Sequence, residues 1–359
     1  MNLSRFHVIT ATCCLIIVGL FVLGCSDDDN PTSPEQYGWS ALGTGVNAHV
    51  SDLTIYNNIL IAGGYFTTAG GASAHRVAAW NGSSWSPLGT GMNATVHALT
   101  VYDNQLIAGG QFTTADGASS NYIAAWGGSS WAPLGTGMNN EIMASTVYDN
   151  KLIAGGRFDT AGGVSTHHIA AWDGSSWSVL GAGANGVVYA LTVYDNRLIA
   201  GGQFTTVGGV SANFVAAWDG SSWSALGTGT NGIVHALTVY DNQLIAGGQF
   251  TTAGGDTTNN LAAWDGTSWS PLGSGMNAPV WSLSAYHNRL IAGGRFDTAG
   301  GVGANFVAAW GGSAWAPLEE GMNSDVKAFT VYSNALIVGG DFTTAGEVSA
   351  NHIAAWRPE

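Results

Sequence analysis

The chain has 359 residues, with 53 Gly and 15 Trp, and its formal net charge is −14 with only nine Lys and Arg. Such sparse, scattered basic residues argue against nucleic acid and against adhesion to anionic lipid headgroups, because both need clustered positive charge. The aromatic content of 11% and the charged fraction of only 9% exclude a disordered chain, since disorder goes with few aromatics and high charge.

Residues 1–24 are predicted to be an export signal. Arg5 supplies a positive start, and residues 8–23 form an uncharged apolar stretch that is short for a membrane span. The stretch ends Val22-Leu23-Gly24-Cys25, which resembles a bacterial lipobox, although Leu23 is bulkier than usual at its position. The resemblance implies that Cys25 carries a lipid. A simple cleaved signal and an uncleaved anchor are the alternatives.

Residues 25–36 are acidic and contain Pro, so they are predicted to form a flexible tether. The only cysteines are Cys13, Cys14 and Cys25. Because the first two leave with the signal, the folded part has no thiol, disulfide or Cys-based metal site. We therefore expect a cell-envelope lipoprotein of the outer membrane or cell surface, in contact with a membrane only through its lipid. A secreted protein is the alternative.

A 46-residue repeat fills residues 37–359. An apolar segment ending in Gly-Gly recurs at this step, and two Trp columns keep the same spacing, one closing an Ala-Ala-Trp segment and one opening a Trp-Ser-Pro-Leu-like segment. A fixed period of this length indicates one supersecondary unit per repeat. The first glycines of the pairs are Gly63, Gly109, Gly155, Gly201, Gly247, Gly293 and Gly339.

Each unit holds four short runs rich in β-branched and aromatic residues, which predict strands. Asp103-Asn104 has the composition of a two-residue hairpin turn, and residues 127–130 that of a four-residue turn. Four antiparallel strands at this period make a blade, so seven units predict an all-β, seven-bladed β-propeller. In the second unit the expected strands are 96–102, 105–112, 122–126 and 131–134.

The two ends of the repeat region complement each other. Residues 39–42 match a fourth strand, whereas the chain finishes at 351–356, which matches a third strand. We predict that Trp39 to Leu42 pairs beside His352 to Trp356 and closes the ring, because closure removes two free sheet edges. The short turn between Trp columns also predicts that the two Trp of a unit, such as Trp80 and Trp85, lie close together.

The repeat resembles a kelch-type propeller over residues 37–359. Kelch units carry a double Gly after an apolar strand, then an aromatic residue, then a Trp after a turn, and here LIAGG, residues 169–173 and residues 177–180 take those places. Trp replaces the usual Tyr, and an Arg that often follows is absent. The resemblance implies mostly protein binding and, in a few members, catalysis. Kelch-type copper oxidases need a Cys crosslinked to Tyr, which this region lacks, so no cofactor is implied.

Antiparallel strands place the links between blades and the links between second and third strands on one face, here called the long-loop face. An Asn recurs in the inter-blade link of every unit, first as Asn47, and indicates either a ring of ligand-binding amides or an Asx-type turn. Residues two and four positions after this Asn differ among units, so they are either a binding rim at the channel mouth or drifted surface positions. The candidate ligand-binding residues are His97, Glu141, Tyr189, His235, Trp281, Asp325 and Lys327.

Catalysis is the weaker hypothesis. Glu141 and Asp325 lie four units apart, too far for a glycosidase pair, which needs roughly 5–10 Å. No His spacing predicts a metal. Arg157 accompanies Asp159, and Arg295 accompanies Asp297, which predicts two exposed ion pairs along strands.

The sequence thus favours a monomeric binding scaffold for protein or glycan at the long-loop face, with no catalytic residue, metal or cofactor. A carbohydrate-active hydrolase or lyase at the channel mouth is the alternative, and a purely structural coat component is the third possibility.

Overall fold

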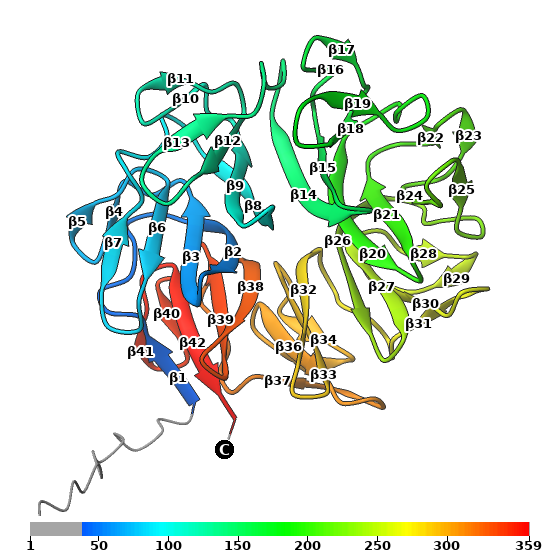
Figure 1. Ribbon diagram of the computed structural model, residues 1–359. Coiled ribbons are helices and arrows are strands. Elements are labelled where there is room, and N and C mark those ends of the chain that lie inside the picture. Colours follow the sequence, from blue (N-terminus) through cyan, green and yellow to red (C-terminus); the bar gives the residue numbers. More distant parts are fainter. Residues whose placement is uncertain (1–37, 359) are drawn as a thin grey trace, which may run out of the picture. The chain divides into compact units, whose positions relative to one another are not determined.

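The computed structural model describes residues 38–358. Over this range seven four-stranded antiparallel sheets surround a central axis, which confirms the predicted seven-bladed β-propeller (Figure 1). Within the described residues no helix is long and apolar enough to cross a membrane. The predicted export signal, Cys25 and the predicted tether lie outside these residues, so their roles stay predictions.

The strands of a blade run outward from the axis in chain order (Figure 1). The innermost strands are β2 (Val50–Tyr56), β8 (Val96–Tyr102), β14 (Ile142–Tyr148), β20 (Val188–Tyr194), β26 (Ile233–Tyr240), β32 (Val280–Tyr286) and β38 (Val326–Tyr332). The second strands are β3 (Ile59–Gly64), β9 (Gln105–Gly110), β15 (Lys151–Gly156), β21 (Arg197–Gly202), β27 (Gln243–Gln249), β33 (Arg289–Gly294) and β39 (Ala335–Gly340).

The outer half of each blade is a shorter hairpin. The third strands are β6 (Val77–Trp80), β12 (Ile123–Trp126), β18 (Ile169–Trp172), β24 (Val215–Trp218), β30 (Leu261–Trp264), β36 (Val307–Trp310) and β42 (Ile353–Arg357). The outermost strands are β7 (Trp85–Pro87), β13 (Trp131–Pro133), β19 (Trp177–Val179), β25 (Trp223–Ala225), β31 (Trp269–Pro271), β37 (Trp315–Pro317) and β1 (Gly38–Ala41).

Turn chemistry fixes the inner hairpin of each blade. Asp103 and Asn104 have φ angles of 47° and 57°, both left-handed. A two-residue turn with two positive φ angles matches the right-handed twist of the strands that it joins. The predicted hairpin is therefore confirmed, and because its register is fixed, the same residues of every inner strand reach the same height along the axis.

The double glycine is required by close packing, the first Gly against the next blade and the second within its own blade. A Cβ on Gly109 would lie 2.6 Å from Cγ2 of Ile142 in the next blade, and one on Gly110 would meet the carbonyl oxygen of Thr95. The core accordingly lies between neighbouring blades, where Phe112 and Ala124 are fully buried against residues of the preceding blade. Each blade therefore depends on its neighbours for its buried surface.

The ring closes as predicted. Strand β1 pairs antiparallel with β42, with Trp39 opposite Trp356 and Ala41 opposite Ala354. Trp39 and Leu42 are only 3% and 4% exposed. The N-terminal strand therefore supplies the outer strand that the seventh blade lacks. The Trp pairs also form: the Trp80 and Trp85 ring centroids are 5.4 Å apart.

A circle of tryptophan hydrogen bonds joins the outer edges of the blades. The indole Nε1 of each outermost-strand Trp donates to the carbonyl oxygen of a Leu just after the outermost strand of the preceding blade. The donor–acceptor pairs are Trp39–Leu318 (3.4 Å), Trp85–Leu42 (2.9 Å), Trp131–Leu88 (3.0 Å), Trp177–Leu134 (3.2 Å), Trp223–Leu180 (3.0 Å), Trp269–Leu226 (2.8 Å) and Trp315–Leu272 (2.9 Å).

This circle gives a stability prediction with an internal control. Trp85→Phe should lower the free energy of unfolding by about 1 kcal/mol more than Trp80→Phe, because it also removes a buried inter-blade hydrogen bond. The Trp80 indole, in the same aromatic pair, makes no hydrogen bond within residues 38–358. Urea unfolding of both variants measures the difference. Equal losses would mean that the bond contributes nothing.

The long loops are more ordered than their sequence indicated. Residues 113–121, the link between the second and third predicted strands, contain a small hairpin of β10 (Thr114–Ala115) and β11 (Ala118–Ser119), and Ala115 bridges to Met92 of the inter-blade link. The corresponding hairpins pair β4 (Thr68–Ala69) with β5 (Ala72–Ser73), β16 (Thr160–Ala161) with β17 (Val164–Ser165), β22 (Thr206–Val207) with β23 (Val210–Ser211), β28 (Thr252–Ala253) with β29 (Asp256–Thr257), β34 (Thr298–Ala299) with β35 (Val302–Gly303), and β40 (Thr344–Ala345) with β41 (Val348–Ser349).

The recurring Asn is part of this framework. The Asn93 side-chain oxygen accepts hydrogen bonds from the backbone N–H groups of Thr113 and Thr114, and its Nδ2 donates to Thr113 Oγ1. The amide thus clamps the inter-blade link to the long loop, which favours the turn interpretation over a ligand-binding ring.

The two expected Arg–Asp ion pairs are wrong. Asp297 takes the place of the usual Thr and accepts a hydrogen bond from Asn277 Nδ2 at 2.6 Å. Arg295 instead reaches Asp325 of the next blade, and Arg157 lies beside Glu141. The physical reason is that residues 157 and 295 follow the last residues of their strands, so the two-residue alternation of side chains no longer holds there.

Candidate functional site

Every innermost strand carries a β-bulge near its start. In β8, Val96 lies opposite Gly110 and Ala98 opposite Gly109, so His97 between them has no partner. A bulge re-aims the extra side chain. The same shift occurs in all seven blades. The seven bulge residues are Ser51, His97, Met143, Tyr189, His235, Trp281 and Lys327.

The bulge residues all line one cavity on the axis, which we call the axial cavity, with a volume of about 240 Å³. That is roughly eight times the share of one water molecule in the liquid. It is smaller than the ~300–1,000 Å³ pockets that enclose drug-sized ligands, so it suits a single chemical group. The bulges stand at the start of the inner strands, so the cavity lies near the long-loop face.

The structure brings together five of the seven candidate residues and separates two. His97, Tyr189, His235, Trp281 and Lys327 line the axial cavity. Their role in binding stays a prediction.

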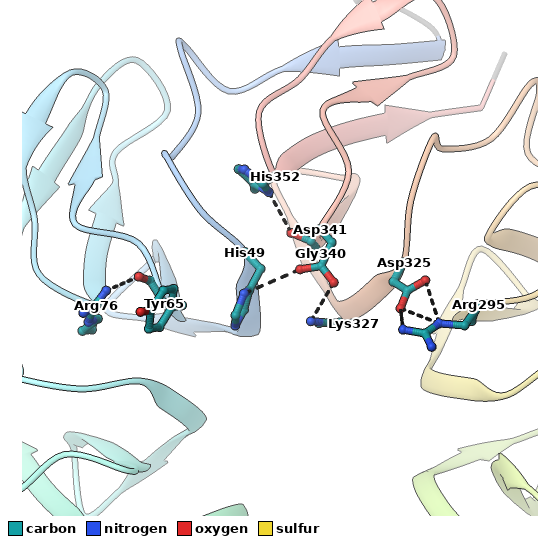
Figure 2. Close-up of polar contacts among 9 residues, drawn as sticks. All are labelled: His49, Tyr65, Arg76, Arg295, Asp325, Lys327, Gly340, Asp341 and His352. Atoms are coloured by element: carbon teal, nitrogen blue, oxygen red, sulfur yellow. Dashed lines mark hydrogen bonds and ion pairs between the residues drawn. The ribbon is translucent and has the colours of Figure 1, made fainter.

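Glu141 and Asp325 are not among the lining residues. Arg295 pairs with the buried Asp325 through two nitrogens, at 3.0 and 2.8 Å, and ties the sixth blade to the seventh (Figure 2). Glu141 lies 3.8 Å from Arg157. The sequence could not show these two ion pairs, because the Arg and the acid of each pair lie on different segments that only the folded blades bring together.

Three neighbouring bulge residues form a continuous aromatic arc, defined by Tyr189, His235 and Trp281. The Tyr189 and His235 ring centroids are 5.1 Å apart, and those of His235 and Trp281 are 4.5 Å apart in an edge-to-face arrangement. Such arrangements are favoured by the ring quadrupoles. One side of the cavity therefore presents an aromatic wall.

The next blades contribute a polar cluster (Figure 2). Lys327 Nζ lies 2.8 Å from Asp341, and His49 Nδ1 lies 3.6 Å from the same carboxylate. His49 also stacks on Tyr65, with ring centroids 5.6 Å apart. The Arg76 guanidinium lies over the Tyr65 ring. Asp341 therefore offsets the positive charge of Lys327.

The histidines of the site are neutral near pH 7. Burial lowers the pKa of His235 to about 4 and also lowers the pKa of His97. The pKa of His49 is lowered to about 4 by burial and then by Lys327, against the opposing effect of Asp341. Neutral imidazoles can donate or accept hydrogen bonds without adding charge to the cavity.

Asp52 is a site residue that the sequence reading missed. It lines the axial cavity, and its carboxylate accepts hydrogen bonds from the backbone N–H of Leu53 at 2.8 Å and of Leu99 at 2.7 Å. Burial outweighs these two bonds and raises its pKa to about 7. No Lys, Arg or His of the described chain lies within ion-pair distance of it.

A comparison of the repeat units distinguishes Asp52 from the equivalent residues of the other blades. Other units carry Ala at its position, except for Ser282 in the sixth. Ser282 Oγ and His97 Nε2 are buried atoms without a hydrogen-bond partner, and both residues line the cavity. The described residues hold no group of three or more His, Asp or Glu placed for a metal ion.

A closed ring of seven four-stranded blades around an axial cavity defines a β-propeller. The sequence model of the Rax2 C-terminal β-propeller domain matches residues 129–279 and again residues 182–333, which together span more than half of the chain. The chain belongs to this family of propeller domains. No curated protein matches the sequence.

Solved structures with the same fold share little sequence with this chain. The WD40 propeller of Doa1 is 14% identical, with a TM-score of 0.57 over 89% of this chain and 96% of that one. The WD40 repeats of RRP9 are 12% identical, with a TM-score of 0.59 over 89% and 96%. The computationally designed Ika8 protein is 18% identical, with a TM-score of 0.54 over 87% and 97%. These likenesses show the fold alone, and the kelch resemblance stays a prediction.

Proposed function

We propose that this protein is an exported, lipid-anchored propeller that binds a partner, protein or glycan, at its long-loop face. One observation carries the proposal: a nearly uniform repeat places seven bulge residues of six different types around one cavity. Binding residues are commonly carried by a rigid scaffold at positions free of packing demands.

The number of carboxyl groups in the axial cavity favours binding over hydrolysis. Asp52 is the one carboxylate among the residues lining the axial cavity. A glycosidase of the usual kind needs two carboxyl groups roughly 5–10 Å apart. The neutral histidines and the aromatic arc suit recognition.

The first described strand begins on the face opposite the cavity. An outermost strand runs from the four-residue turn toward the long-loop face, so β1 begins, at Gly38, on the opposite face. A tether of residues 25–36 would join the ring there.

Binding is tested with envelope extracts and a glycan array. We expect a partner that is retained by the wild-type protein and by Val147→Thr, on the inner strand toward the short turns, but lost with Trp281→Ala. Empty results in both assays, or equal retention by Trp281→Ala, would contradict the proposed role of the cavity.

Lipidation makes a separate prediction. Cys25→Ala should release the protein from membranes into the soluble fraction, because one acylated residue would be its only membrane contact. Mass spectrometry of the wild-type N-terminus should find a diacylglycerol on Cys25. Ser26→Ala is the control and should stay membrane-bound. An unmodified Cys25 in the membrane fraction would contradict the anchor.

A further inference from the structure

The axial cavity holds a carboxylate that lacks a counter-charge. Asp52 accepts two backbone hydrogen bonds but has no cationic side chain within ion-pair distance in the described chain. Asp52 is half-buried at the wall of the cavity. A charged group that is partly removed from water is stabilised by a partner of opposite charge, because desolvation disfavours the ionised form. A cation entering the cavity would supply the missing partner.

The aromatic arc provides a second attraction for a cation. Ammonium groups bind to the faces of aromatic rings, with Trp the strongest and Tyr next. Tyr189 and Trp281 flank the neutral His235 in the arc, and all three residues line the same cavity as Asp52. The combination of aromatic surface and carboxylate is the usual chemistry for recognising organic ammonium groups.

Competing positive charge near the arc is offset by acidic partners. Arg157 Nη2 donates to the Tyr189 hydroxyl at 3.4 Å, and Arg157 Nε lies 3.8 Å from the Glu141 carboxylate. Lys327 is held by Asp341 at 2.8 Å (Figure 2). His97 and His235 have lowered pKa values and add no charge near pH 7. The formal net charge of −14 favours the approach of cations.

Two buried polar atoms of the cavity residues also lack a hydrogen-bond partner. Ser282 Oγ, in a residue that is 9% exposed, and His97 Nε2 make no hydrogen bond in the described structure. Either atom can accept a hydrogen bond from an ammonium N–H. A neutral sugar would leave Asp52 without a counter-charge, and an anion would be repelled by it.

We infer that the axial cavity binds an organic ammonium group, held between the Asp52 carboxylate and the aromatic arc of Tyr189, His235 and Trp281. The inference rests on the proposed binding role of the long-loop face and is independent of the lipid anchor. The volume of about 240 Å³ admits one such head group. Its source is either a small quaternary amine or a primary amine of the lysine type.

Calorimetric titration of the wild-type protein tests the charge requirement directly. The probes are choline, n-butylammonium and 3,3-dimethylbutan-1-ol, the neutral isostere of choline. We expect at least one ammonium probe to bind at least tenfold more tightly than the neutral alcohol. Tighter binding of choline would identify a quaternary head group, and tighter binding of butylammonium a lysine-like amine.

Variants test the residues. Asp52→Asn should weaken binding of the better probe at least tenfold, and Trp281→Leu at least threefold. Asp149→Asn makes the same charge change in a two-residue turn on the opposite face and should leave binding unchanged. If Asp52→Asn does not fold, the comparison of choline with its isostere in the wild-type protein still decides the question.

The inference fails if the alcohol binds as tightly as the ammonium probes, if neither ammonium probe binds, or if folded Asp52→Asn binds as the wild type does. Loss of a protein or glycan partner on Trp281→Ala would, in any of these cases, leave the proposed function standing. Absence of any cavity-dependent partner together with selective ammonium binding would reject the partner and keep the inference.

Discussion

Deletion of residues 37–43 should lower the melting temperature by on the order of 10 °C or prevent folding. The deletion removes β1, exposes the edge of β42, and takes away two side chains that are 3% and 4% exposed, Trp39 and Leu42. Truncation of a buried Trp costs about 3–5 kcal/mol and of a buried Leu about 2–5 kcal/mol. The indole bond from Trp39 to Leu318 is lost as well.

Two controls separate ring closure from mere shortening. Deletion of residues 26–36 should leave the melting temperature unchanged, because these residues precede the first strand. A permuted chain that carries residues 38–43 after residue 357, through a Gly-Ser-Ser-type turn, should recover most of the loss, because every other blade is built that way. An unchanged melting temperature in the deleted protein would mean that the ring does not depend on this strand.

The fold could be predicted from the sequence because its signals are local and repeated. The Asp-Asn turns, the Gly-Gly pairs and the two Trp columns each have one physical reason and occur at one fixed step. The repeat region begins with an unpaired fourth strand at residue 39 and ends with a third strand at residue 351. Pairing these two strands is the one arrangement that leaves no sheet edge without a partner.

The bulges and the small loop hairpins could not be predicted in the same way. A bulge depends on two residues facing one across the hairpin, and the bulge residues range from Ser51 to Trp281 with no shared chemistry. Strands of two residues, such as β10, are too short to show a period.

The site could be predicted in part. Variable positions in a uniform repeat pointed to five residues that line the axial cavity. Asp325 and Glu141 do not line it, because each pairs with an Arg that follows a second strand, of the preceding blade for Asp325 and of its own blade for Glu141. Asp52 was overlooked because its column was read as nearly uniform, whereas it replaces Ala in a single blade.

Asp52 should also give the protein a measurable dependence of stability on pH. Its pKa is about 7 in the folded protein, against an ordinary value of 3.8. Between these two values the folded state holds a proton that the unfolded state has released, so the free energy of unfolding falls as pH rises. This contribution is complete below about pH 4 and is lost as pH passes through about 7.

The histidines act in the opposite direction. The pKa values of His49 and His235 are lowered to about 4, so their contribution raises stability as pH increases from about 4 to about 6.5. The two effects offset each other in the wild-type protein. The difference in unfolding free energy between the wild type and Asp52→Asn isolates the carboxyl, because the histidines are common to both.

We expect that difference to fall by about 2–3 kcal/mol between pH 5 and pH 8, since each pH unit in the window contributes at most ~1.4 kcal/mol. Urea unfolding at four pH values measures it, and Asp149→Asn should show no such trend. A difference that is flat with pH would mean that Asp52 is already ionised at pH 5.

A saturating ammonium ligand should reduce the dependence of this free-energy difference on pH, because a bound cation favours the ionised carboxylate and brings its folded-state pKa back toward the ordinary value. The pH dependence of stability and the selectivity for ammonium would then have the same origin, a carboxylate folded into the cavity without its counter-ion.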